Sequence, residues 1–192
     1  MGIDPGIRRV NPTGVAILDD RDNVLLTTTV KPHSDKGEWL TRVPDIGDTL
    51  MEIAREWHVG IGLIAFEAPI ISTDARFNPE STAPLWALIG MVLGMARTLA
   101  VPVVRVQPTE VKLALAGKRN ATKEDMQAVA KLLTGREMSS HEADAIGIVK
   151  AGVVKWHAMK IVAKIEMEER KVKEKAARIN RGGVPFAEDV YL

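Results

Sequence analysis

Three β-type runs stand at the beginning of the chain, with only a short loop and a turn between them. Residues 14–19 (GVAILD) and 23–31 (NVLLTTTVK) are rich in β-branched and apolar residues, and Ile3 and Asp4 belong to a run before them. The connection at 20–22 (DRD) consists of turn-forming residues. Because connections this short join only antiparallel neighbours, the sequence predicts a meander of three antiparallel strands.

Helical and strand patterns alternate after this meander. A helical stripe over 38–58 leads into a buried strand pattern at 59–67, and the long apolar helix 79–100 leads into a short strand at 101–106. Three more helices are predicted, over 108–117, over 123–134 and from about residue 139 onwards. We therefore expect an α/β fold with one mixed sheet, in which three antiparallel strands are followed by parallel βαβ strands, flanked by helices.

The length of 192 residues leaves room for one such domain and a tail. We expect the domain to span 1–152 and a basic helical extension with its tail to span 153–192. Cysteine is absent, which excludes thiolate nucleophiles and Cys-ligated zinc, and no apolar run reaches the roughly 18 residues of a membrane span. We expect a cytoplasmic protein without membrane contact, whose chemistry depends on carboxylates, histidines and lysines.

The charge of the chain is unevenly distributed. The net charge is only +1, but residues 155–181 contain nine Lys or Arg and four Glu. This segment is a candidate arm that faces the phosphates of a nucleic acid. The alternative is a solvated helix whose Glu and Lys side chains pair across single turns.

Asp4 is a carboxylate at the end of a predicted core strand, where an unpaired charge is costly to bury. Glu67 ends another predicted strand, and strand ends of an open α/β sheet gather at one edge. His141 and Asp144, spaced i,i+3, share one face of a helix. Carboxylates gathered in one place need a compensating cation, and Mg2+ prefers their oxygen atoms. The sequence therefore predicts a metal site formed by these four side chains.

A simpler interpretation stays open for each of these residues. Asp4 can form a turn before proline, Glu67 can face solvent, and His141 can face water at a helix start. Glu142 forms with Ser139 the S-x-x-E pattern of a capping box, so we leave Glu142 outside the predicted site.

An ordered set of motifs runs through the chain: GIDPG at 2–6, Thr13-Gly14, an apolar strand ending in Glu67, Val111-Lys112 with Gly117 and Lys123 downstream, and HEADAIGI at 141–148. This set resembles the RuvC family of Holliday-junction resolvases over roughly residues 2–150. The resemblance implies an RNase H-like fold and a homodimer that nicks branched DNA in a metal-dependent, symmetric reaction. By position, Asp4, Glu67 and Asp144 correspond to three catalytic acids of the family, and His141 to a fourth position where the family uses Asp or His.

As the mechanism we expect catalysis by Mg2+, with two ions per active site, for which Mn2+ substitutes. One ion generates hydroxide from water and the other stabilises the leaving 3'-oxygen, so the products carry 5'-phosphate and 3'-hydroxyl ends. We expect Asp4 to bridge the ions, and His141 to bind metal or to help deprotonate the water.

Basic and aromatic residues near this site are expected to bind the DNA. Lys112 and Lys123 match two lysines that the family places at the DNA, and Lys112 also offsets charge that develops during the reaction. The remaining candidates are Lys118 and Arg119 in the loop GKRNATK, Arg8 and Arg9 in the long loop IRRVNP, and Phe77. Phe77 is included because APII, which follows Glu67, lacks the aromatic residue that many relatives place there to wedge into the junction.

The helix over 82–99 is apolar on more than one face. Trp86 and Met91 lie away from part of its main apolar stripe, which gives the helix a second apolar face. Gly90 and Gly94 permit close approach of another backbone. A second subunit would cover such a face, so we expect a homodimer formed through this helix. The alternative is a helix that lies wholly within the core of one chain.

Two other classes of function use similar residues. An RNase H-like nuclease that acts on RNA–DNA hybrids or flaps shares the same acids. An actin-like or sugar-kinase-type ATPase also carries Asp-x-Gly in its first strand, but it normally contains two copies of the fold, and this chain has length for one. A DNA-binding module without catalysis would be expected to lose a ligand, whereas all four are present.

Only three residues precede Asp4, whereas strands typically run about 5–6 residues. We expect the natural protein to begin a few residues upstream, or else a short, frayed first strand with a loosely held Asp4.

Overall fold

The computed structural model describes residues 1–34, 36, 38–58, 60–69 and 79–181. The elements follow in the order β1 (Gly2–Asp4), β2 (Thr13–Leu18), β3 (Val24–Val30), α1 (Trp39–Glu56), β4 (Ile64–Glu67), α2 (Pro79–Thr98), β5 (Val103–Val106), α3 (Pro108–Ala116), α4 (Lys123–Thr134) and α5 (Ser140–Arg181). The chain divides into two compact units, Met1–Lys155 and Trp156–Leu192.

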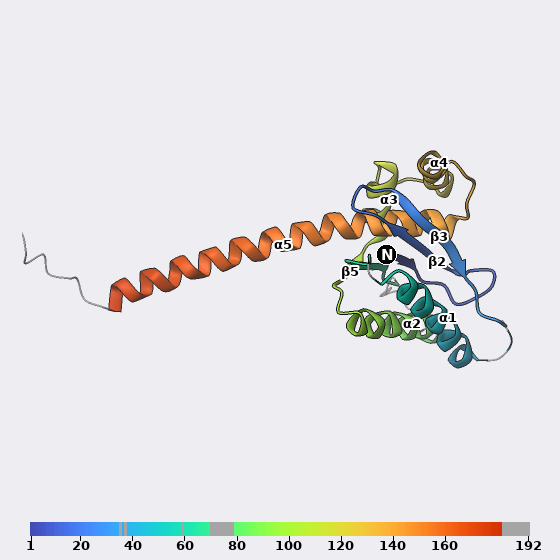
Figure 1. Cartoon of the computed structure of the whole chain (residues 1–192), viewed down its shortest axis with the longest axis horizontal. Helices are drawn as coiled ribbons and strands as arrows, with labels where there is room; N and C mark the ends of the chain where they lie inside the picture. The colour runs from blue at the N-terminus through green and yellow to red at the C-terminus, as the bar shows by residue number, and fades with distance from the viewer. Residues whose placement is uncertain (35, 37, 59, 70–78, 182–192) are drawn as a thin grey trace, which may run out of the picture. The chain divides into compact units, whose positions relative to one another are not determined.

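The five described strands form one mixed sheet in the order β3-β2-β1-β4-β5 (Figure 1). β1 pairs antiparallel with β2, where Ile3 lies opposite Val15, and parallel with β4, where Ile3 lies beside Phe66. β2 and β3 are antiparallel, while β4 and β5 are parallel. The predicted α/β class, with a meander followed by parallel strands, is therefore confirmed.

β1 is as short as expected, but it is not frayed. All three of its residues pair with β2, Gly2 and Ile3 also pair with β4, and Ile3 is fully buried. The Met1 ammonium donates a hydrogen bond to the Leu63 carbonyl at 2.9 Å, and the Ala65 amide donates to the Met1 carbonyl at 2.8 Å. The neighbouring strands thus hold β1 along its whole length.

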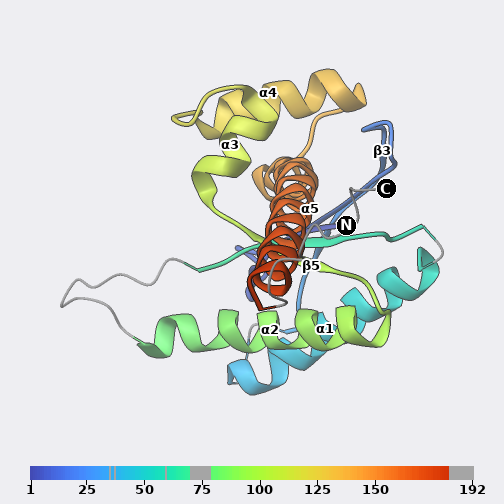
Figure 2. The ribbon, with the colours of Figure 1, turned by 90° about the vertical axis from the view of Figure 1, so that its left-hand side faces the viewer.

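Helices cover both faces of the sheet. α1 and α2 lie on one side, and α3, α4 and the first part of α5 lie on the other (Figures 1 and 2). The amphipathic stripe of α1 buries Ile46 and Leu50 against the same core that contains Leu88 and Val92 of α2. This packing supports the sheet from the side of α1 and α2.

The helices on the second face begin and end where their sequences predict. At the start of α4, the Asp125 amide donates to the Thr122 hydroxyl at 3.2 Å, and the Thr122 amide donates to the Asp125 carboxylate at 2.8 Å. α3 and α4 end at Gly117 and Gly135, whose φ angles of 72° and 73° lie in the left-handed region that favours glycine.

Two glycines allow α5 to lie directly on the sheet. A Cβ atom on Gly14 of β2 would lie 2.1 Å from the His141 carbonyl oxygen, and one on Gly2 of β1 would lie 2.4 Å from the Ala145 carbonyl oxygen. Side chains at these positions would push the helix away. Glycine at positions 2 and 14 therefore sets the distance between α5 and the sheet.

In the unit that begins at Trp156, the described residues up to Arg181 are helical. Ile161 and Ile165 are more than half exposed. The ion pairs Arg170–Glu174 (3.0 Å) and Lys171–Glu168 (2.9 Å) join successive turns, as the solvated-helix alternative predicts. Across the described residues, none of the helices combines the length and the apolar character that crossing a membrane requires.

Candidate active site

Asp4 and Glu67 end two neighbouring parallel strands. Because Ile3 pairs with Phe66, the next residue of each strand, Asp4 of β1 and Glu67 of β4, lies at the same edge of the sheet. Both line a cavity of about 310 Å³ that also contacts Thr82 and Leu85 of α2. The predicted convergence of these two acids is therefore present in the fold.

The first turns of α5 bring His141 and Asp144 to the same edge. The imidazole Nδ1–H of His141 donates a hydrogen bond of 2.8 Å to Oδ2 of Asp4. Both side chains are about four-fifths buried, and the hydrogen bond that His141 donates to Asp4 raises the pKa of His141, although burial opposes this. Asp4 is thus held in place, contrary to the expectation of a loosely held side chain.

The remaining two acids are electrostatically coupled to Asp4. Burial, together with the charges of Asp4 and Asp144, raises the pKa of Glu67 to about 7, while Lys112 opposes this shift. Burial and Asp4 raise the pKa of Asp144 to about 6, and His141 and nearby lysines oppose this. All four predicted ligands therefore share one electrostatic environment.

The predicted basic residues fall into two groups around these acids. Lys112 of α3 and Lys123 at the start of α4 act on the pKa values of the site and so lie within electrostatic reach of it. Lys118 instead forms an ion pair of 2.8 Å with Asp125, and Arg119 is exposed between the two helices.

Arg8 and Arg9 lie in the loop between β1 and β2. The Arg8 amide donates to the Asn11 carbonyl at 3.1 Å, which closes the loop, and Arg9 donates from Nη1 to the His33 carbonyl at 3.3 Å. Arg8 also lines a cavity of about 300 Å³ that shares Leu85 with the acidic cavity. Phe77 lies outside the described residues.

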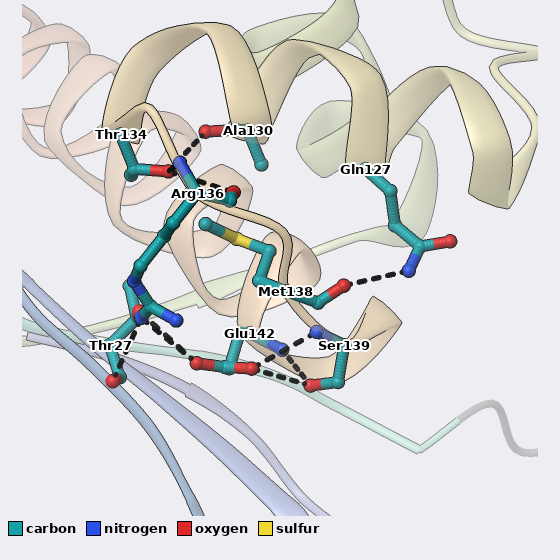
Figure 3. Close-up of polar contacts among 8 residues, drawn as sticks. All are labelled: Thr27, Gln127, Ala130, Thr134, Arg136, Met138, Ser139 and Glu142. Carbon is teal, nitrogen blue, oxygen red and sulfur yellow. Dashed lines mark hydrogen bonds and ion pairs between the residues drawn. The ribbon is translucent and has the colours of Figure 1, made fainter.

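The capping box predicted at the start of α5 is present. The Ser139 amide donates to Oε2 of Glu142 at 3.0 Å, and the Glu142 amide donates to the Ser139 hydroxyl at 3.2 Å (Figure 3). The sequence did not indicate two further partners of this carboxylate, Arg136 and Thr27. Thr27 is 115 residues away from Glu142, so no local pattern could reveal that contact.

The three carboxylates and the imidazole of this cluster are chemically suitable ligands for a divalent cation. As the side chains stand, no three Asp, Glu or His residues of the described ranges are grouped closely enough to hold a metal ion. Burial and repulsion between the carboxylates raise the pKa values of Glu67 and Asp144. A bound cation would offset both effects, because it stabilises the ionised carboxylates. Oxygen atoms and one imidazole are also donors that such a cation accepts.

The family model described as crossover junction endodeoxyribonuclease RuvC matches residues 1–155. The chain belongs to the RuvC family. Curated RuvC proteins are similar to it: that of Anaeromyxobacter dehalogenans strain 2CP-1 is 33% identical over 150 residues, covering 77% of this chain and 76% of the relative. RuvC of Cupriavidus metallidurans strain CH34 is 31% identical over 163 residues, covering 77% of this chain and 79% of the relative.

Solved RuvC structures agree with this assignment. Thermus thermophilus RuvC matches with a TM-score of 0.62 and 26% identity, over 83% of this chain and 95% of that one. The same protein in complex with a Holliday junction substrate matches with a TM-score of 0.63 and 27% identity, over 83% and 94%. The predicted RNase H-like fold and the resemblance to the RuvC family, whose members are metal-dependent nucleases, are confirmed.

Proposed function

We propose that this protein is a metal-dependent endodeoxyribonuclease that resolves Holliday junctions or related branched DNA by paired nicks. The observation that carries the proposal is the coupled cluster of Asp4, Glu67, His141 and Asp144 in a chain of the RuvC family. A similar RuvC has been solved with a Holliday junction substrate, which supports the choice of DNA. We expect products with 5'-phosphate and 3'-hydroxyl ends.

We further propose that these four residues hold Mg2+, with two ions per site and Mn2+ as a substitute. Such ions supply an activated water and stabilise the leaving 3'-oxygen. Asp4 has the central place in this proposal, because it contacts His141 and acts on the pKa values of Glu67 and Asp144.

The protein's own side chains have distinct roles in this mechanism. His141 holds a proton at Nδ1 towards Asp4, which leaves Nε2 to bind metal or to accept a proton from the attacking water. Lys112 offsets the negative charge that develops at the phosphate. The proposed contacts to the DNA are Arg8, Arg9, Lys118, Arg119 and Lys123 with the phosphates, and Phe77 as the aromatic wedge.

A substrate panel tests this function. The purified protein is incubated with Mg2+ or Mn2+ and with a four-way junction, a flap, an RNA–DNA hybrid and a linear duplex of matched sequence. We expect paired, symmetric nicks in the junction. Preferential cutting of the hybrid or the flap would favour the related RNase H-like nuclease, and ATP hydrolysis without DNA would favour the ATPase alternative.

We infer a homodimer formed through α2, within residues 82–99. The face of this helix that points away from the core contains Gly90, Leu93 and Gly94, and Leu93 is 46% exposed. Among the residues that the structure describes, no atom comes within 4 Å of a Cβ placed on either glycine, so a partner backbone can approach there. Met91, which we predicted to lie partly outside the core stripe, instead packs against Gly47 of α1.

The segment 153–192 is proposed to be a basic extension that binds DNA outside the nuclease domain 1–152. The family match ends at residue 155, and positive charge is concentrated beyond it. We also infer that the protein acts in the cytoplasm, or in the host cytoplasm if a phage encodes it, because its proposed substrate is intracellular DNA.

A further inference from the structure

Glu142 lies in the sequence between two proposed metal ligands, His141 and Asp144, but it makes its contacts elsewhere. Its carboxylate reaches towards β3, and only 13% of the side chain is exposed (Figure 3). A carboxylate buried to this extent needs several partners. Its partners connect the start of α5 to a distant part of the sheet.

Each carboxylate oxygen of Glu142 has its own set of partners. Oε2 accepts hydrogen bonds from the amide and the hydroxyl of Ser139, both at 3.0 Å, within the first turn of α5. Oε1 accepts from Nη2 of Arg136 at 3.1 Å and from the Thr27 hydroxyl at 3.2 Å. One oxygen therefore caps the helix, and the other ties it to β3.

Arg136 strengthens the tie to β3. Its Nη2 donates to the Thr27 carbonyl at 3.2 Å and also contacts the Thr27 hydroxyl. Arg136 belongs to the loop between α4 and α5, which Gln127 of α4 fixes by donating to the Met138 carbonyl at 2.8 Å (Figure 3). The loop, the strand and the helix start are thus joined through one guanidinium group.

These contacts complement the glycine contacts described above. Gly14 and Gly2 set how closely α5 approaches the sheet, whereas hydrogen-bonded side chains also fix the rotation of the helix and its position along the sheet. The tie from Glu142 and Arg136 to Thr27 opposes both movements. His141, the residue before Glu142, then meets Asp4 with a hydrogen bond of 2.8 Å.

We propose that Arg136 and Glu142 are positioning residues, which fix the first turn of α5 on β3 so that His141 and Asp144 face Asp4 and Glu67. The inference rests on the proposed function, since it takes those four side chains as the metal ligands. Partners that orient metal ligands typically contribute about 10–100-fold to metal affinity or activity. Capping alone would contribute to the stability of α5 without this effect.

The experiment separates the capping half of the network from the half that reaches β3. Arg136→Ala removes the guanidinium contacts to Thr27 and Glu142, so that only the hydrogen bond from the Thr27 hydroxyl to Glu142 still joins α5 to β3, and it leaves the capping box. Ser139→Ala removes the capping hydroxyl and leaves all contacts to Thr27. Arg136→Lys keeps the positive charge but replaces the planar guanidinium, with its several N–H donors, by a single ammonium group. Glu137→Gln, which breaks an exposed pair with Lys131 in the same loop, is the matched control.

Two measurements are made on each full-length variant: Mn2+ affinity by calorimetry, and junction cleavage over a range of Mn2+ concentrations. We expect Arg136→Ala to weaken Mn2+ binding by about 10–100-fold, and high Mn2+ to restore cleavage to nearly the wild-type rate. Arg136→Lys should be intermediate. Ser139→Ala and Glu137→Gln should bind Mn2+ like the wild type, even where Ser139→Ala melts at a lower temperature.

Hydrogen exchange of the amides of residues 140–145 in the metal-free protein provides a separate criterion. We expect faster exchange in Arg136→Ala than in Glu137→Gln. Wild-type Mn2+ affinity in Arg136→Ala, or equal losses in Arg136→Ala and Ser139→Ala, would overturn the inference. If the wild type neither binds Mn2+ nor cuts junctions, the proposed function fails, and hydrogen exchange alone then decides whether Arg136 orders this turn.

Discussion

Asp4 makes the one direct hydrogen bond that the structure records among the four proposed ligands, and it acts on the pKa values of the other two acids. Asp4→Asn should therefore reduce junction nicking by more than about 100-fold, which is the upper end for residues that only orient ligands. Junction binding should stay unchanged or become tighter, because one charge that repels phosphate is removed. Gel-based cleavage and binding assays measure the two effects.

Asp20→Asn is a suitable control for this substitution, since Asp20 is an exposed acid of the β2–β3 turn. It removes the same charge from the protein without touching the cluster. Near-wild-type nicking by Asp4→Asn would remove Asp4 from the mechanism.

The raised pKa of Glu67 predicts how stability depends on pH in the absence of metal. Folding raises this pKa from 4.5 to about 7, so between these values the folded protein holds a proton that the unfolded chain releases. The free energy of unfolding should therefore fall as the pH rises from about 4.5 to about 7, by at most about 3 kcal/mol from this group. Asp144, raised from 3.8 to about 6, adds a fall in the overlapping range.

Urea unfolding at pH 5 and pH 8 in the presence of EDTA tests this dependence. Glu67→Gln should be more stable than the wild type at pH 8, because it removes the charge that burial and repulsion disfavour. Added Mn2+ should stabilise the wild type at pH 8 and should have little effect on Glu67→Gln. A wild-type protein equally stable at both pH values would contradict the prediction.

At the scale of the elements, the contact between β2 and α5 should be intolerant of added volume. Gly14→Ala places a methyl group 2.1 Å from the His141 carbonyl oxygen, so α5 must move. Forced repacking of this kind typically costs about 1–3 kcal/mol. We expect a lower melting temperature together with weaker Mn2+ binding, measured by calorimetry.

Gly62→Ala is the matched control, because a Cβ at Gly62 meets no atom within 4 Å. Gly62→Ala should change neither the melting temperature nor Mn2+ binding. Unaltered Mn2+ binding by Gly14→Ala would mean that the distance between α5 and the sheet does not affect the site.

The outward face of α2 should determine the oligomeric state. Leu93→Glu places a charge in the middle of the proposed interface and should convert a dimer into a monomer, as measured by sedimentation. Leu132→Glu is the control, because Leu132 of α4 is 84% exposed and lies outside that interface. A wild-type protein that is monomeric at all concentrations would reject the dimer itself.

Local patterns predicted most elements, and they placed Asp4 and Glu67 at strand ends and His141 and Asp144 on one helix. Thr122 and Gly135 delimit α4 as expected, and Ser139 caps α5 through Glu142 as the S-x-x-E pattern predicts. Arg136 could not be recognised as a partner of Thr27, because 109 residues separate them and only the packed fold brings them together. That Met91 packs against α1 could not be predicted, because the apolar pattern of one helix does not show where the neighbouring helix lies.

The close contact between Gly14 and His141 illustrates a second limit of sequence reasoning. A glycine in a strand suggests a bulge or a close approach, but it does not name the element that approaches. The pairing of Asp4 with His141 was predicted only as convergence at a sheet edge. The hydrogen bond itself depends on the rotation of α5, which the sequence does not specify.

At the scale of the whole molecule, the segment after residue 155 should add to DNA affinity. Truncation after Lys155 removes eight Lys or Arg residues. For every phosphate that the shortened protein no longer neutralises, the slope of log affinity against log salt should become shallower by about 0.9 on B-DNA. Truncation after Arg181 removes none of these basic residues and serves as the control. An unchanged slope after the first truncation would mean that the segment does not bind DNA.

The acids of the site come from the beginning, the middle and the far end of the unit Met1–Lys155. A ribosome that has made every strand has still not made His141 or Asp144. A chain that ends after the described strands and before residue 141 therefore carries two of the four proposed ligands, and we expect it not to cut. Synthesis of the first turns of α5 is then the step expected to make the proposed nuclease active, because it supplies the last two ligands.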